Sequence, residues 1–184
     1  MRTKDRVLLS GAVGPRDHAQ GPASAPITLV EYGDYECPHC ARAHPIVKQL
    51  QRQLGSDLRV VFRNFPLTNI HAHAQHAAES AEAAGAQGRF WEMHDTLFKH
   101  QRALDDDSLA GYAATIGLDT DRFERELAGH LHGARVREDV ATGARSGVNG
   151  TPTFFINGVR HDGGWELEML QAAIRRVTAD VIAD

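Results

Sequence analysis

Two runs of apolar and β-branched residues near the start of the chain are typical of buried strands, and a stretch with helical periodicity separates them. Residues 27–32 (ITLVEY) form the first run, and residues 58–65 (LRVVFRNF) form the second. Apolar residues from Ala43 to Leu54 recur at the spacing of one helix face, and Pro38 suits the first turn of such a helix. This pattern predicts a right-handed βαβ unit with parallel strands.

A long region with helical periodicity follows, from Pro66 to about Ser146. An alanine-rich segment from Ala72 to Ala86 begins it, and four further amphipathic stretches complete it. The acidic run Asp105–Ser108 precedes one of these stretches and supplies both negative charge and an N-cap. We therefore expect five helices in this region.

The last part of the chain returns to a strand pattern. Residues 153–156 (TFFI) are apolar, Asn157-Gly158 is a strong signal for a two-residue hairpin turn, and residues 159–161 are expected to pair back. Apolar positions from Leu167 to Val177 predict a closing amphipathic helix. At the opposite end of the chain, Arg6–Ser10 predict a short first strand.

These elements predict an α/β protein with one mixed central sheet flanked by helices. The strand-bearing segments 1–66 and 147–184 are expected to form one discontinuous domain, and residues 67–146 an inserted, all-helical subdomain. With 184 residues and 42% hydrophobic composition, the chain is long enough to bury a sizeable core.

The net charge and the apolar runs of the chain indicate which classes of partner to expect. A net charge of −4 gives no basic surface of the kind that binds nucleic acid, and no apolar run approaches the roughly 18 residues that span a bilayer. We expect a soluble monomer that binds neither nucleic acid nor membrane. Arg2, Lys4 and Arg6 precede a short apolar stretch that Ser10 and Gly11 interrupt. We therefore expect a cytoplasmic protein, with a periplasmic or exported one as the alternative if this segment is a processed signal.

The candidate chemistry is concentrated in one tetrapeptide, Cys37-Pro38-His39-Cys40. It holds the only two cysteines of the sequence and lies where the first central strand is expected to meet its helix. Two cysteines this close cannot staple a loop-rich fold, whereas the backbone amides and dipole of a helix N-terminus stabilise a thiolate. The position predicts a reactive thiol at Cys37.

This layout resembles the thioredoxin fold. The helical insertion and the Pro-His pair between the cysteines are similar to the DsbA family of thiol-disulfide oxidoreductases, in a bacterial DsbA-like branch. Glu31 stands six residues before Cys37, where the family has a buried acid, and Pro45 stands eight residues after it, where the family has a helix-kinking proline. Thr151-Pro152 matches the cis-proline dipeptide of the family. Two longer strings also agree: residues 62–66 (FRNFP) and residues 150–158 (GTPTFFING).

The resemblance implies a different role for each cysteine. Cys37 would be the attacking thiol, and Cys40 would resolve the mixed disulfide. Pro38 and His39 would tune the thiolate, since each pKa unit corresponds to about 1.4 kcal/mol, or roughly 30 mV in a two-electron couple. Stabilising the reduced form makes the disulfide more oxidising. Glu31 would be the buried acid that carries the Cys40 proton, because burial raises the pKa of a carboxyl.

The resemblance also implies the partners of the reaction. Thr151 and Pro152 would bind the backbone of an extended substrate opposite Cys37. We expect cysteine-containing protein substrates and an unidentified redox partner, no metal, and no cofactor beyond a redox-active Cys37–Cys40 disulfide. Oxidase, reductase and isomerase share these residues, so the sequence leaves the direction of exchange open.

Two other functions remain open. Glutathione-dependent transferases and isomerases with DsbA-like folds have a similar helical insertion, although they generally lack the second cysteine. The other alternative is a zinc-binding or redox-sensing module, in which Cys37 and Cys40 join two of the histidines His71, His73 and His76. Zinc sites of this spacing need a loop that wraps the ion, whereas here the second cysteine continues into a helix. We therefore expect these histidines to lie along a solvated helix edge.

Overall fold

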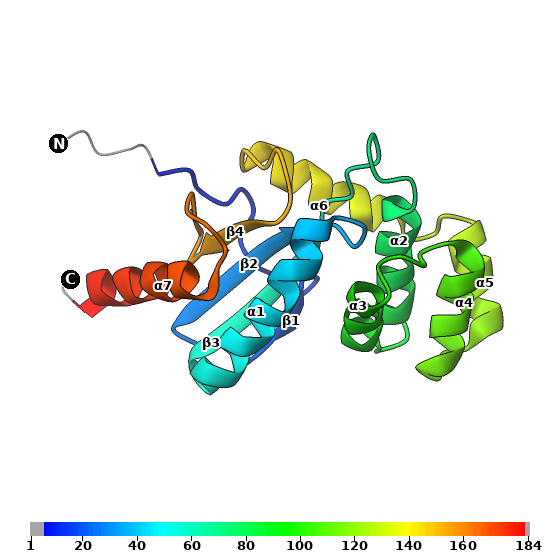
Figure 1. Cartoon of the computed structure of the whole chain (residues 1–184), viewed down its shortest axis with the longest axis horizontal. Coiled ribbons are helices and arrows are strands. Elements are labelled where there is room, and N and C mark those ends of the chain that lie inside the picture. The colour runs from blue at the N-terminus through cyan, green and yellow to red at the C-terminus, as the bar shows by residue number, and fades with distance from the viewer. Residues whose placement is uncertain (1–5, 183–184) are drawn as a thin grey trace.

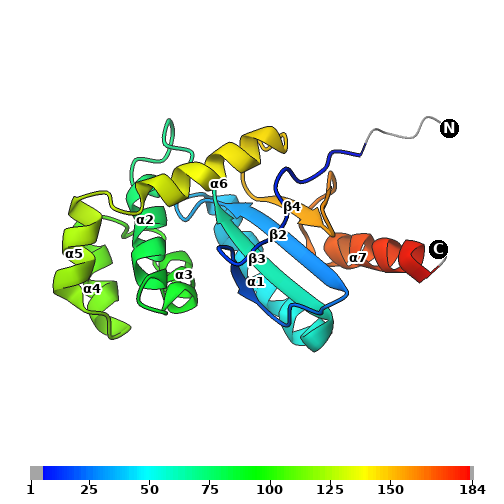
Figure 2. The ribbon, with the colours of Figure 1, turned by 180° about the vertical axis from the view of Figure 1, so that it is seen from behind.

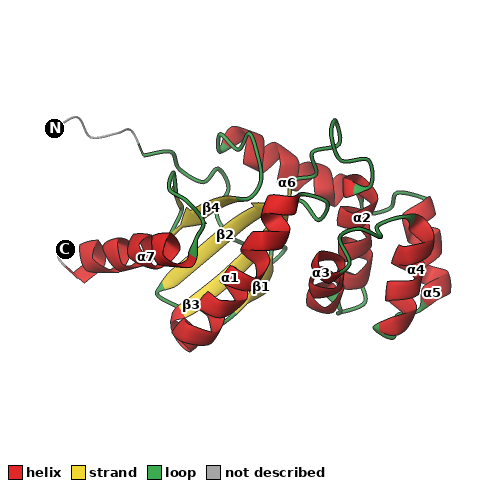
Figure 3. Ribbon diagram, viewed as in Figure 1, coloured by secondary structure: helices red, strands yellow, loops and turns green. Residues whose placement is uncertain are grey.

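The central sheet of the computed structural model, which describes residues 6–182, has five strands in the order β1-β3-β2-β4-β5 (Figure 3). The strands are β1 (His18–Gln20), β2 (Ile27–Gly33), β3 (Leu58–Asn64), β4 (Thr153–Ile156) and β5 (Val159–Arg160). β2 and β3 are parallel, as the βαβ pattern predicts, and the other three pairings are antiparallel. The sheet is therefore mixed.

The hairpin between β4 and β5 turns at the dipeptide that the sequence indicated. Asn157 and Gly158 both have positive φ angles, 46° and 80°. Two successive residues with positive φ match the twist of the flanking strands, which explains the preference for Asn-Gly at such a turn. The side chain of Asn157 also accepts a hydrogen bond from the amide of Thr28, and this contact fixes the turn against β2.

Two helices cover one face of the sheet. These are α1 (Pro38–Leu54), followed by the short 3₁₀ helix η1 (Gly55–Asp57), and α7 (Leu167–Ile182) (Figure 1). Leu29 and Val60 of the central strands pack with Val47 and Leu50 of α1 and with Leu170 of α7 in one apolar cluster. Pro45 lies inside α1, which continues through it.

The opposite face is covered by α6 (Gly133–Arg145) and by the segment before β1 (Figure 2). Val140 of α6 packs against a cluster that contains Val61 and Phe155. Gly143 makes a close approach possible, because a Cβ at this position would lie 2.7 Å from the ring of Phe65 and 3.0 Å from that of Tyr32. The last helix of the predicted insertion, α6, thus also packs against one face of the sheet.

The remaining four helices lie beyond the edge of the sheet, at the right of Figure 1. They are α2 (Ala74–Gly85), α3 (Phe90–Lys99), α4 (Asp106–Thr115) and α5 (Thr120–Ala128). Asp105 caps α4 by accepting from the amide of Ser108, as the acidic run predicts. These helices share an apolar cluster with Cys37 and Cys40, so the core of the helical region continues to the cysteine pair.

The N-terminal segment differs from the prediction. Arg6–Ser10 is not a strand: only Leu8 forms an isolated bridge, with Val159. The segment has few strand-forming residues before Ser10 and Gly11 interrupt it, and it pairs with the two-residue edge strand β5. The first strand is β1 instead, which is too short to show an alternating pattern.

Arg2 and Lys4, part of the possible signal segment, lie outside the described residues. Within residues 6–182, the helices lack the combination of length and apolar character that crossing a membrane requires.

Candidate active site

The two cysteines lie where β2 gives way to α1. Cys37 is the N-cap residue of α1, with extended backbone angles, and Pro38 occupies the first turn, where a missing amide costs no hydrogen bond. Cys40 lies within the helix. Both are unpaired thiols; Cys37 is 4% exposed and Cys40 is fully buried. Cys37 is therefore the thiol nearer to the surface, although only its edge reaches solvent.

Several groups stabilise the thiolate of Cys37. The largest contribution is a hydrogen bond from the Cys40 thiol; burial opposes it, and Thr151 and the backbone amides of Cys40 and His39 assist it. Together they lower the pKa of Cys37 from 9.0 to about 5. The amides are the free N–H groups of a helix N-terminus. Cys37 is therefore ionised at neutral pH.

Cys40 and Glu31 are perturbed in the opposite direction. Burial, followed by the hydrogen bond to Cys37 and the charge of Glu31, raises the pKa of Cys40 well above its ordinary value. Glu31 is 3% exposed, and burial together with the negative charge of Cys37 raises its pKa to about 8. Its Oε1 atom is buried and lacks a hydrogen-bond partner within the described part of the chain. Beside Glu31 lies a cavity of about 10 Å³, large enough for about one water molecule.

Thr151 and Pro152 face the cysteine pair from the loop before β4. Their peptide bond is cis, and Cys37 Sγ lies 3.4 Å from the Thr151 carbonyl oxygen. The Thr151 hydroxyl is buried and has no hydrogen-bond partner among residues 6–182, other than the ionised sulfur that it helps to stabilise. A shallow cavity of about 200 Å³ extends from Pro152 past His161 to Trp165.

His39 is exposed, and its ring contacts Arg42 and Trp165. The guanidinium of Arg42 lies 2.8 Å from His39 Nδ1, and Trp165 lies at 6.5 Å between ring centroids. His39 lowers the pKa of Cys37 through its backbone amide. Pro38, beside it, is also exposed.

Two polar residues that the sequence pattern did not single out hold the loop before α1. The carboxylate of buried Asp34 accepts from the amides of Glu36 and Leu67, both at 2.8 Å. Gln101, after α3, donates to the carbonyls of Tyr35 and Cys37 at 2.8 and 2.7 Å. An aspartate between a strand and a helix is a common turn residue, which was the available signal for Asp34.

Three side chains near Glu31 form a possible metal-binding group. The nearest ligand atoms of His44, His94 and Asp95 lie within 4.8 Å of one another. Each residue already has a protein partner: Lys48 contacts Asp95 at 2.9 Å, His44 contacts Asp95 at 3.3 Å, and the Tyr35 hydroxyl lies 3.0 Å from His94 Nδ1. Cys37 and Cys40, the ligands of the zinc alternative, do not belong to this group.

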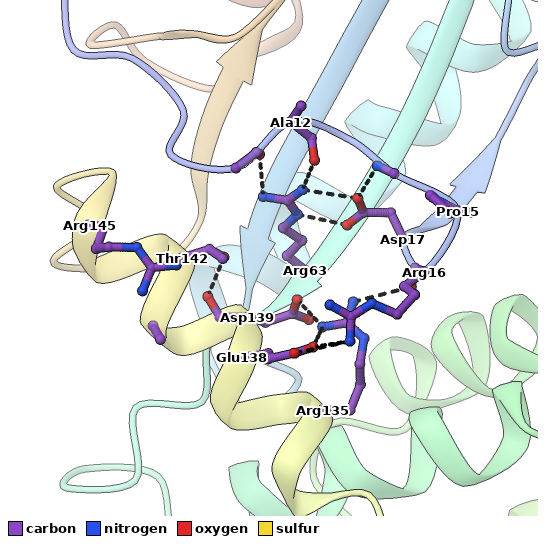
Figure 4. A pocket seen from close by; sticks show the side chains of 13 residues that line it. Ala12, Pro15, Arg16, Asp17, Arg63, Arg135, Glu138, Asp139, Thr142 and Arg145 are labelled. Carbon is purple, nitrogen blue, oxygen red and sulfur yellow. Dashed lines mark hydrogen bonds and ion pairs between the residues drawn. The ribbon is translucent and has the colours of Figure 1, made fainter.

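A larger cavity, of about 450 Å³, lies away from the cysteines between the N-terminal segment and α6 (Figure 4). Arg63 of β3 points into its wall and pairs with Asp17 at 2.7 and 3.0 Å. The same guanidinium donates to the Tyr32 hydroxyl and to the carbonyls of Gly11 and Ala12. These contacts fasten the N-terminal segment to the sheet.

Comparison with known proteins identifies the family and the fold. The thioredoxin family profile matches residues 14–176. BdbD from Bacillus subtilis superposes with a TM-score of 0.80 at 21% identity, over 92% of this chain and 97% of that chain. A thioredoxin-like oxidoreductase from Silicibacter pomeroyi gives 0.80 at 28% identity, over 90% and 94%.

Higher identity is found with part of a much longer protein. A Na⁺/H⁺ antiporter, NhaA 1 of Salinispora arenicola, is 52% identical over 159 residues, which are 86% of this chain and 24% of that protein. The chain thus spans about a quarter of the length of the curated relatives that it matches. The profile covers most of the chain and the fold extends over nearly all of it. The chain therefore belongs to the thioredoxin family and has the DsbA-like form of its fold.

Proposed function

We propose that this protein is a protein thiol-disulfide oxidoreductase that exchanges disulfides through Cys37 and Cys40. The observation that carries the proposal is the asymmetry of the two thiols. Cys37 is held ionised with a pKa of about 5, whereas the pKa of its neighbour Cys40 is raised well above the ordinary value. An exposed thiolate edge beside a buried thiol is what stepwise exchange requires.

In the reducing direction, the Cys37 thiolate attacks one sulfur of a substrate disulfide. A Cys37–substrate bond forms, and the other substrate sulfur leaves as a thiolate. Cys40 then loses its proton and attacks Cys37 Sγ, which releases the second substrate thiolate and leaves a Cys37–Cys40 disulfide. The oxidising direction is the reverse sequence, in which two substrate thiols supply the electrons.

Glu31 is proposed to carry the proton of Cys40. With a pKa of about 8, its carboxyl can exchange a proton near neutral pH, and its charge is one of the causes of the raised pKa of Cys40. Attack on a substrate by Cys37 removes a negative charge from the site. That loss favours ionisation of Glu31, because the Cys37 charge is one of the two causes of its raised pKa.

Thr151 and Pro152 are proposed to dock the substrate backbone. The Thr151 carbonyl lies 3.4 Å from Cys37 Sγ, so a chain bound here brings its own sulfur next to the attacking atom. The cavity between Pro152 and Trp165 extends this surface. Its shallow form is suited to an extended polypeptide that contains cysteine.

The proposal is tested by trapping the intermediate. Cys40→Ala should accumulate mixed disulfides with a cysteine-containing test protein, because nothing then resolves them, and Cys37→Ala should form none. Insulin reduction by dithiothreitol and oxidative refolding of a reduced protein measure turnover. Exchange that persists at the wild-type rate in Cys37→Ala contradicts the proposal.

The direction of exchange is measured separately. The wild-type protein is equilibrated with glutathione buffers, and the fraction of Cys37–Cys40 disulfide gives the potential. We expect an oxidising pair, since a pKa lowered from 9.0 to about 5 stabilises the reduced form at pH 7 by about two pKa units, or roughly 60 mV in the two-electron relation. A potential near the value of about −270 mV for thioredoxin would favour a reductase.

A second candidate function follows from the match to antiporter segments, and it concerns the partner. The identity of 52% to part of NhaA 1 favours a thiol module that works with a Na⁺/H⁺ antiporter. Sodium-driven proton movement in membrane vesicles that contain such an antiporter, measured with oxidised, reduced or Cys37→Ala protein added, tests this. Equal rates in all three mixtures exclude it.

A cytoplasmic location and a monomeric state remain proposals. Cell fractionation with an antibody measures the first, and light scattering of the purified protein measures the second.

A further inference from the structure

His71 lies in the segment between β3 and α2 and reaches back to the loop that carries the cysteines. Its Nδ1 atom lies 2.7 Å from Asp34 Oδ2, and its side chain is 15% exposed while that of Asp34 is fully buried. α2 begins at Ala74, so His71 precedes the helix and is not part of a solvated helix edge. The buried carboxylate of Asp34 therefore holds the His71 ring in place.

Asp34 connects His71 to both cysteines through its backbone. The Asp34 amide points at Cys40 Sγ at 3.5 Å, and the Asp34 carbonyl accepts from the amide of Cys37 at 3.2 Å. The carboxylate also holds the amides of Glu36 and Leu67. A change at the His71–Asp34 pair is thus a change at a residue that contacts the sulfur of Cys40 and the backbone amide of Cys37.

Three negative charges act on His71, those of Asp34, Cys37 and Glu36. Burial disfavours its charged form, but the hydrogen bond and charge of Asp34, followed by the charges of Cys37 and Glu36, raise the pKa of His71 above its ordinary value. Only one of these three charges depends on the redox state. Cys37 is a thiolate in the reduced protein and is neutral in a disulfide.

His39, between the cysteines, lacks such a setting. It is exposed, and the guanidinium of Arg42 lies 2.8 Å from its Nδ1 atom. The histidine on the far side of the pair is better placed to respond to the thiolate.

We propose that His71, held by Asp34, is a positioning residue whose protonation is coupled to the redox state of Cys37. The inference rests on the proposed thiol-disulfide exchange and specifies its pH dependence. Reduction by a substrate dithiol adds two electrons to the disulfide, gives a thiolate at Cys37 and a thiol at Cys40, and promotes proton uptake by His71 from solvent. Oxidation releases that proton.

The sign of the coupling follows from linkage. The pKa of His71 is higher in the reduced protein than in the oxidised protein, so its charge stabilises the reduced form. This stabilisation is complete below the oxidised-state pKa and is lost as the pH rises through the reduced-state pKa. The redox potential of the protein is therefore higher below the oxidised-state pKa of His71 than it would be without the charge of His71.

The direct test is an NMR titration of the histidine ring protons in the reduced and the oxidised wild-type protein. The His71 resonance is assigned by its loss in His71→Asn. We expect its pKa to be at least about half a unit higher in the reduced protein, which is a threefold change in the equilibrium and about 15 mV at a pH below the oxidised-state pKa. Equal pKa values in the two states overturn the proposal.

Variants separate the charge of His71 from its hydrogen bond. Asparagine at this position places an N–H donor near the site of Nδ1 without a titrating charge, and alanine removes both. In glutathione equilibria, His71→Asn should keep a stable fold but have a lower potential than wild type at acidic pH, with the two curves meeting above the reduced-state pKa. His73→Asn, on the same segment and exposed, is the matched control and should follow wild type.

The outcomes distinguish this inference from the proposed function. If the wild-type protein shows no exchange through Cys37, the proposed function fails. If exchange is present and His71→Asn has the wild-type potential at every pH, the coupling fails alone. If His71→Ala is unstable, His71→Asn and the wild-type titration still decide the question.

Discussion

The thiol of Cys40 contributes more than any other group to the low pKa of Cys37, and Cys40→Ala tests this directly. A hydrogen bond to a charged group contributes about 1.5–3 kcal/mol, and 1.36 kcal/mol corresponds to one pKa unit. Removing the Cys40 donor should raise the pKa of Cys37 from about 5 to between about 6 and 7. At pH 6 the thiolate fraction should then fall from about 90% to between roughly 50% and 10%.

The assay is the ultraviolet absorbance of the thiolate, followed against pH in the reduced protein, with the rate of alkylation by iodoacetamide as a second measurement. Cys40 does not interfere in the wild type, because its pKa lies well above that of Cys37. Cys40→Ser is the matched control, since its hydroxyl keeps a donor near the sulfur. It should titrate closer to wild type than Cys40→Ala does.

One result would refute this reasoning. If Cys40→Ala titrates at the wild-type value, the amides of the helix N-terminus and Thr151 are sufficient to hold the thiolate. The low pKa would then be a property of the N-cap position, and Cys40 would act only as the resolving thiol.

Three further predictions concern stability, each measured by urea unfolding. Glu31→Gln should be more stable than wild type at pH 9 by at most about 5 kcal/mol and similar to it at pH 4. The pKa of Glu31 is about 8 in the folded protein and 4.5 ordinarily, so wild type loses stability as the pH rises from about 4.5 through about 8. A pH-independent difference contradicts this account. Gln101→Ala should cost about 1–3 kcal/mol, because the carbonyls of Tyr35 and Cys37 lose a donor, and no change would mean that solvent replaces it. Arg63→Ala should lower the free energy of unfolding by about 3–5 kcal/mol, because it leaves Asp17 buried without its partner. The double variant Asp17→Asn with Arg63→Met should recover much of this stability. Equal losses in the single and the double variant would argue against an effect of charge.

Periodicity was sufficient to predict most of the fold. The apolar runs at 27–32 and 58–65 became the parallel strands β2 and β3, and Asn157-Gly158 became the hairpin turn. The strand β1 could not be found in this way, because its three residues are too few for an alternating pattern. Its position depends on pairing with β3, which is a contact between residues distant in the sequence.

The candidate site was predictable where local structure determines it. The N-cap position of Cys37 follows from the strand-helix junction, and the structure places Glu31, Thr151 and Pro152 around it. The contact between Asp34 and His71 was not predictable, because it joins residues 37 positions apart. The alanine pattern also placed the start of α2 at Ala72, two residues before its actual start, and so assigned His71 and His73 to a helix edge, whereas His76 does lie on α2.

Helix α6 belongs to the helical region in the sequence but covers the sheet in the fold, and this has a practical consequence for protein engineering. A graft that exchanges the helical region between relatives would naturally be spliced at residues 67 and 146, yet α6 supplies the lining of one face of the sheet through Val140 and Gly143. A donor helix with a larger side chain at the glycine would collide with Phe65. The safer splice lies between α5 and α6, so that the recipient keeps its own lining helix.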